Sequence, residues 1–178
     1  MTSALLIIDV QTILCEGRWA VHEADAVVQR INAVSARARA AGLPVVVVQH
    51  EEADGPMLYD APGWQLAPAL QVSATDLRLR KTGSDAFHQT DLQAQLQARG
   101  VDRLIVCGMQ TDFCVDSTVR RALALGYPVS LVSDAHSTLD NGVLSAAQII
   151  AHHNLTLSQL GSYGPRVTLV PAAQAECS

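Results

Sequence analysis

Short β-branched runs alternate along this chain with longer stretches of helical period, and this alternation limits the possible folds more than any other feature. Each run is almost continuously apolar and is bounded by Gly, Pro, Asp or Ser, as is typical of strands buried on both faces. We expect strands at residues 5–10, 45–49, 104–107, 129–132 and 166–170, and a weaker, alternating strand at 76–80. This order of elements predicts βαβ units and a mainly parallel sheet of five to six strands.

The stretches between these runs predict helices that end at glycine. Apolar side chains recur there at steps of three and four residues, and a glycine follows each stretch. The expected helices cover residues 23–41, 91–99, 112–125 and 143–160. Residues 51–71 instead contain Gly, Pro, Asp and aromatic side chains, which indicates a long functional loop. Because no repeat or linker is visible, we expect a single domain over residues 1–178.

Charge and composition exclude several classes of function. The formal net charge is −5, so the chain has no basic field for a nucleic-acid partner. Hydrophobic residues make up 49% and charged residues 16%, which favours a well-buried globule or a homo-oligomer, a dimer or tetramer. No apolar run approaches the roughly 18–20 residues of a membrane span, and the N-terminal run lacks the basic residues of a secretory signal. With four scattered cysteines and no C-x-x-C pair, we expect a cytoplasmic protein without a membrane partner.

Motifs that are absent narrow the chemistry further. The glycines form neither G-x-G-x-x-G nor the phosphate-binding G-x-x-x-x-G-K-[ST], so a parallel sheet here does not imply a nucleotide. The nucleophile elbow G-x-S-x-G and the zinc motif H-E-x-x-H are also missing. What remains is a set of polar side chains at the carboxyl ends of the expected strands, where open α/β sheets bind their ligands.

Three of these side chains indicate nucleophilic catalysis. Asp9 ends an aliphatic run, and burial disfavours a carboxylate unless a cation or hydrogen-bond donors compensate it. Lys81 follows the strand at 76–80 and could supply that cation. Cys114 comes directly after a strand, in the first turn of a helix that Thr111 could cap. A helix N-terminus and a nearby ammonium both lower the pKa of a thiol, which predicts a nucleophilic thiolate.

These residues belong to three separated motifs through which the sequence resembles the isochorismatase-like family of cysteine hydrolases over essentially its full length. The motifs are a strand that ends in Asp-x-Gln, a Lys followed by Ser-x-x-Phe, and Gly-x-x-Thr-x-x-Cys-Val. They comprise Asp9 and Gln11; Lys81, Ser84 and Phe87; and Gly108, Thr111, Cys114 and Val115. Residues 62–64, Lys81 to Phe87 and Ala135-His136 are most similar to the branch of small amide hydrolases that includes streptothricin-hydrolase-like proteins.

The resemblance implies a Rossmann-like, three-layer α/β/α sandwich with strand order 3-2-1-4-5-6. It implies a catalytic triad of Asp9, Lys81 and Cys114 at the carboxyl edge of the sheet. It also implies a cis peptide bond between Met109 and Gln110, with the backbone N–H groups of Gln110 and Cys114 directed at a developing oxyanion. The expected reaction cleaves a C–N bond of a small molecule, an amide, a lactam or a related group, through a Cys114 thioester.

The departures from the family pattern concern metal and substrate. Nicotinamidases of the family bind a metal through Asp-x-His after the second strand, whereas this chain reads Gln49-His50-Glu51-Glu52, so we expect neither a metal nor a cofactor. Two alternatives stay open, a metal-assisted nicotinamidase-type amidase and a catalytically inactive binding or oligomerisation module of the same fold. The expected substrate pocket contains Gln11, His50, Trp64, Phe87 and Phe113.

Overall fold

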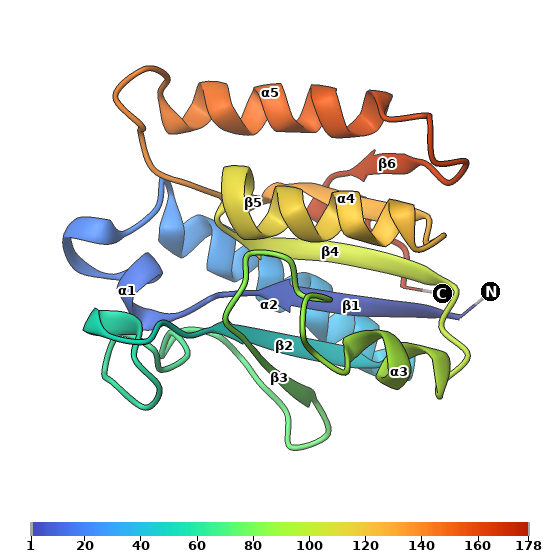
Figure 1. The fold of residues 1–178 in the computed structure, drawn as a ribbon, viewed down its shortest axis with the longest axis horizontal. Coiled ribbons are helices and arrows are strands. Elements are labelled where there is room, and N and C mark those ends of the chain that lie inside the picture. The colour runs from blue at the N-terminus through green and yellow to red at the C-terminus, as the bar shows by residue number, and fades with distance from the viewer. Residues whose placement is uncertain (1, 178) are drawn as a thin grey trace.

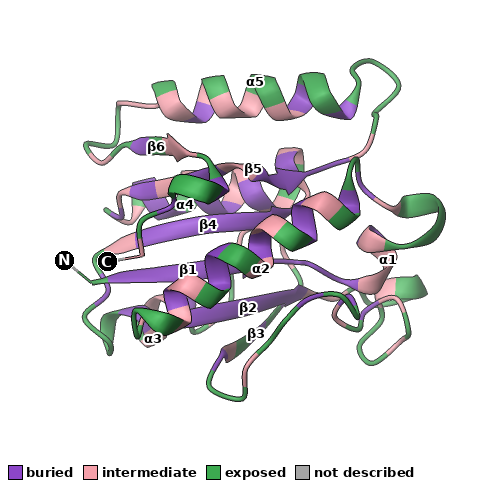
Figure 2. Ribbon diagram, turned by 180° about the vertical axis from the view of Figure 1, so that it is seen from behind, coloured by how far each residue is buried: buried purple, intermediate pink, exposed green. Residues whose placement is uncertain are grey.

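A six-stranded parallel sheet forms the centre of the computed structural model, which describes residues 2–177 (Figure 1). Its strands lie in the order β3-β2-β1-β4-β5-β6, and all neighbouring pairs are parallel, which confirms the expected topology. The strands are β1 (Ser3–Ile8), β2 (Val45–His50), β3 (Leu77–Lys81), β4 (Arg103–Met109), β5 (Val129–Ser137) and β6 (Val167–Val170). Every residue of β1 is buried because β1 lies between β2 and β4 and is covered on both faces (Figure 2).

Helices cover both faces of the sheet. The long helix α2 (Ala24–Ala40) packs on one face, and α3 (Leu92–Gln97), α4 (Asp116–Ala124) and α5 (Ala146–Gln159) pack on the other. The short helix α1 (Thr12–Cys15) follows β1, at the edge where the carboxyl ends of the strands lie (Figure 1). Among the helices of residues 2–177, none combines the length and the apolar content that a membrane crossing requires.

Two helices differ from the sequence expectation for local reasons. The stretch expected as one helix at 112–125 is a π-helical turn, Thr111–Val115, that continues into α4. Helix α5 begins at Ala146 rather than at 143, because Ser145 and Gln148 form a reciprocal capping box there. The strand expected at 129–132 extends to Ser137, which places His136 inside the sheet.

Gly108 fixes how closely β4 approaches β1. Its φ is +121°, and a Cβ atom at this position would lie 2.1 Å from the carbonyl oxygen of Ile8. No other residue type fits this backbone, so glycine is required where the two strands end side by side. This close approach brings the turn after β4, which contains Cys114, next to Asp9 at the end of β1.

Candidate active site

Asp9 directly follows β1 and has a left-handed backbone, with a φ of 50°. This conformation is uncommon for a residue other than glycine and is characteristic of functional sites. The side chain is 1% exposed, and its Oδ2 atom accepts a hydrogen bond of 2.7 Å from Lys81 Nζ. Within the described part of the chain, the Oδ1 atom has no hydrogen-bond partner. One carboxylate oxygen is therefore engaged and the other is available for a proton.

Lys81 ends the edge strand β3 and lies beside His50 of β2. Its buried Nζ lies 2.7 Å from Asp9 Oδ2, 3.1 Å from the Gly83 carbonyl oxygen, 3.2 Å from Cys114 Sγ and 3.3 Å from His50 Nδ1. An ammonium has three protons, so Lys81 cannot donate to all four of these atoms at once. Burial lowers the pKa of Lys81, but the Asp9 charge, together with Cys114 once it is ionised, outweighs burial and leaves the pKa above its ordinary value. Lys81 is thus a permanent cation and hydrogen-bond donor at this site.

Cys114 lies in the π-helical turn, where it is partly buried. Burial raises the pKa of the Cys114 thiol to about 12; Asp9 adds to this rise and Lys81 opposes it. The expectation of a lowered thiol pKa is therefore wrong in direction, because burial of the sulfur and the neighbouring Asp9 together outweigh the Lys81 ammonium. At neutral pH the site contains an Asp9–Lys81 ion pair beside a protonated thiol.

The turn that presents Cys114 is anchored to β5 and α5. The sequence suggested that Thr111 caps the helix, but it does not. Its hydroxyl instead lies 2.9 Å from His136 Nδ1. His136 Nε2 lies 3.0 Å from Asn154 Oδ1, and Asn154 Nδ2 donates to the Ser133 carbonyl. Asn154 Oδ1 can only accept, so the hydrogen of the neutral His136 ring lies on Nε2. Nδ1 then accepts a hydrogen bond from the Thr111 hydroxyl. Burial lowers the pKa of His136 to about 4, which keeps this connection neutral.

A cavity of about 220 Å³ opens beside the sulfur. Two of the expected pocket residues, His50 and Phe113, line it together with Asp9, Cys114 and Gln110. The sequence analysis missed four further side chains that line the cavity: Leu14, Glu52, Met57 and Ser84. Three of them come from the loops after β2 and β3, where sequence pattern does not reveal which side chains turn inward; Ser84 could have been found from its place in the Lys81 motif.

Three residues expected in the pocket do not line this cavity. Gln11 is fully buried, and its side-chain amide donates to the carbonyl oxygens of His50 and Trp64, so it fixes the loop after β2. Trp64 is 9% exposed and packs edge-on against Tyr59, with ring centroids 4.9 Å apart. Phe87 stacks on Tyr127 in the apolar core instead. Phe87 thus belongs to the apolar core, whereas Gln11 and Trp64 hold the loop after β2 in place.

Comparisons with known proteins agree with this geometry. The isochorismatase domain family matches residues 3–155. The chain belongs to the isochorismatase family. It is 44% identical over 140 residues to a streptothricin hydrolase from Streptomyces noursei, an alignment that covers 77% of this chain and 50% of that protein. This chain therefore spans about half the length of the streptothricin hydrolases that it matches.

Solved structures of the isochorismatase family share the whole fold. A crystal structure of an isochorismatase family protein superposes with a TM-score of 0.86 at 38% identity, covering 94% of this chain and 97% of the other. The N-carbamoylsarcosine amidase from Thermoplasma acidophilum superposes with a TM-score of 0.84 at 27% identity, covering 99% of each chain.

The peptide bond between Met109 and Gln110 is cis, at the position that the family resemblance implies. Gln110 lines the cavity and precedes the π-helical turn directly. The use of the Gln110 and Cys114 N–H groups as oxyanion donors stays a prediction.

The side chains of Asp9, His50 and Cys114 could together ligate a metal ion, since their ligand atoms all lie within 4.8 Å of one another. In this isochorismatase-family site, however, the Lys81 ammonium lies 2.7–3.3 Å from an atom of each of the three. A metal at the point where these ligands converge would have to displace a buried cation. The arrangement of donors therefore fits an ammonium better than a metal.

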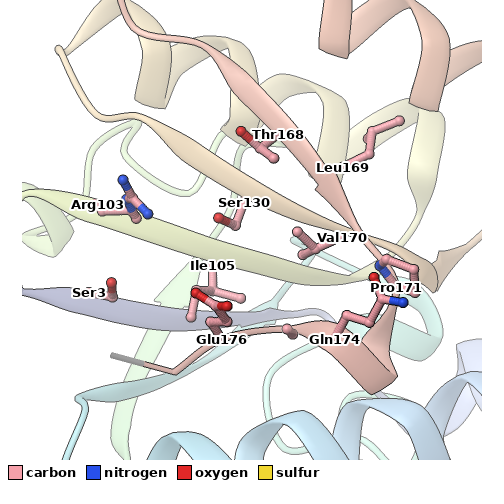
Figure 3. Close-up of a pocket in the computed structure, with 11 residues that line it drawn as sticks. Ser3, Arg103, Ile105, Ser130, Thr168, Leu169, Val170, Pro171, Gln174 and Glu176 are labelled. Atoms are coloured by element: carbon pink, nitrogen blue, oxygen red, sulfur yellow. The ribbon is translucent and has the colours of Figure 1, made fainter.

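A larger cavity of about 650 Å³ lies elsewhere in the molecule (Figure 3). It is bordered by the first residues of β1 and β4, Ser3 and Arg103, and by the chain after β6, including Pro171 and Gln174. None of the residues around Cys114 lines it. Because ligands of parallel α/β sheets bind at the carboxyl ends of strands, the smaller cavity is the candidate active site.

Proposed function

We propose that this chain hydrolyses a carbon–nitrogen bond of a small molecule, an amide, a lactam or a related group, through a thioester on Cys114. One observation supports this most strongly: a single buried ammonium contacts both the Asp9 carboxylate, at 2.7 Å, and the Cys114 sulfur, at 3.2 Å. Two similar proteins are named as a streptothricin hydrolase and an N-carbamoylsarcosine amidase, and both names fit this class of reaction.

In the first half-reaction, Asp9 acts as the general base. Its unpartnered Oδ1 atom takes the proton of the Cys114 thiol while Sγ attacks the substrate carbonyl carbon. The carbonyl oxygen becomes an oxyanion that the N–H groups of Gln110 and Cys114 stabilise. As the C–N bond breaks, Asp9 returns the proton to the departing nitrogen, which leaves as an amine or ammonia, and the acyl group stays on sulfur.

In the second half-reaction, Asp9 takes a proton from a water molecule that attacks the thioester. The C–S bond breaks, a carboxylic acid leaves, and the proton returns to the Cys114 sulfur. Lys81 holds Asp9 in place and stabilises the sulfur whenever it is anionic. Because burial and Asp9 raise the pKa of the Cys114 thiol, we infer that the thiol gives its proton to Asp9 as the sulfur attacks.

A panel of primary amides, lactams, carbamates and imides tests this function through the release of acid or ammonia. We expect hydrolysis of at least one class, with a rate that a metal chelator leaves unchanged. Loss of the rate with chelator would instead support the metal-assisted amidase. Absence of hydrolysis across the panel, together with a Cys114 that no amide protects from alkylation, would support an inactive module. That the active form is a cytoplasmic homo-oligomer remains part of the proposal.

A further inference from the structure

Two adjacent glutamates at the end of β2 have different surroundings. Arg80 binds both carboxylate oxygens of Glu51, at 2.7 and 3.1 Å, and its guanidinium lies over the ring of Tyr59, 3.8 Å from the centroid. Glu52 has an exposed side chain that lines the cavity beside Cys114. Among residues 2–177, no hydrogen bond or ion pair to the Glu52 carboxylate is found. The charge of Glu51 is therefore compensated, whereas that of Glu52 is open to a ligand.

The backbone of Glu52 is fixed although its carboxylate has no partner. Its N–H donates to the Met57 carbonyl oxygen at 3.0 Å, and it forms a β-bridge with Leu58. Met57 lines the same cavity. The loop after β2 thus folds back on itself and holds Glu52 at the cavity, while within residues 2–177 its carboxylate has neither a hydrogen bond nor an ion pair.

Glu52 determines the charge of the cavity. None of the nine residues that line it is Lys or Arg. The Asp9 charge is compensated by Lys81, and Cys114 is a neutral thiol. Burial and the nearby Lys81 lower the pKa of His50, so this ring is neutral as well. One negative charge remains, on Glu52, and it opposes an anionic substrate while attracting a cationic one.

We propose that Glu52 binds the positively charged group of a cationic amide substrate while Cys114 attacks its carbonyl. This inference rests on the proposed hydrolysis and names the class of substrate. Phe113 supports it, because its exposed ring lines the same cavity and aromatic faces attract organic cations. Leu14 and Met57 provide apolar contact for the part of the substrate between the cation and the amide.

The first test measures the charge preference of the site without any turnover. Methanethiosulfonates that carry a trimethylammonium or a sulfonate group react with Cys114, and peptide mass spectrometry follows their rates at this residue alone. We expect the ratio of cationic to anionic reagent rates to fall about fivefold in Glu52→Gln and to fall as salt rises in the wild type. The ratio cancels any change in the intrinsic reactivity of the thiol.

Asp54→Asn is the matched control. Asp54 is an exposed residue of the same loop that does not line the cavity. Its substitution by asparagine removes one negative charge, as Glu52→Gln does. We expect Asp54→Asn to keep the wild-type ratio. An equal fall in both variants, or no fall in Glu52→Gln, would overturn the inference.

Matched substrates give the second test. 4-Aminobutanamide carries an ammonium where pentanamide, its neutral analogue of the same length, carries a methyl group. We expect 4-aminobutanamide to protect Cys114 from iodoacetamide at lower concentration, and Glu52→Gln to remove most of this difference. Equal protection by both amides would contradict the role of Glu52. Selective protection, with no hydrolysis of any compound of the panel, would uphold the binding role while refuting the proposed function, so the two failures are distinguishable.

Discussion

Replacing Cys114 by alanine or serine is expected to abolish hydrolysis, with a fall in kcat of at least about 10⁴-fold, because the acyl group then has no sulfur to receive it. The fold should remain intact. The side chain is small and only partly buried, so we expect its loss to change the free energy of unfolding by about 1 kcal/mol or less. Rates on the amide panel and thermal unfolding of the same preparations measure both effects.

Cys177→Ala is the control for this substitution, since Cys177 is another free, partly buried cysteine and lies outside the cavity. It should keep wild-type rates. Hydrolysis that persists in Cys114→Ala at more than about one hundredth of the wild-type rate would refute the covalent route.

Replacing Lys81 by methionine is expected to damage both stability and catalysis. The Asp9 carboxylate, 1% exposed, would lose its cation, and breaking a buried ion pair in this way costs about 3–5 kcal/mol. For a chain of this length that corresponds to a fall in Tm of about 10 °C. Since an isolated buried carboxylate favours its neutral form, Asp9 would also be lost as a base, and kcat should fall by about 10³-fold.

The double variant Lys81→Met/Asp9→Asn separates these two effects. It removes both charges together, so it should recover a large part of the lost Tm while remaining inactive. Unchanged stability in Lys81→Met would show that the ion pair does not form. Recovery of activity in the double variant would show that Asp9 is not the base.

The sequence predicted the fold well because each strand has a local signal. The aliphatic runs of β1 and β2 indicate strands buried on both faces, and the alternating run at 76–80 corresponds to β3 at the edge of the sheet. The sequence did not predict the π-helical turn at Thr111–Val115, because one turn is too short for helical periodicity to distinguish its type.

The candidate site was predicted less evenly. The convergence of Asp9, Lys81 and Cys114 could be predicted because each lies at the end of a strand or in the turn that follows one, and parallel strands bring their carboxyl ends to one edge. The direction of the thiol pKa was wrong because it depends on how deeply folding buries the sulfur, which the sequence does not show. The sequence could not place Trp64 for a similar reason, since an aromatic residue in a loop can face a pocket or, as Trp64 does against Tyr59, pack on its own loop.

The most direct test of the account is the mass of the intact protein during turnover of an amide from the panel, quenched rapidly in acid. The account predicts an adduct with the mass of the acyl group on Cys114, absent from Cys114→Ala, and formation of the corresponding hydroxamate when hydroxylamine is added. Turnover that proceeds with neither an adduct on Cys114 nor a hydroxamate would contradict the thioester, and with it the role proposed for Asp9, Lys81 and Cys114.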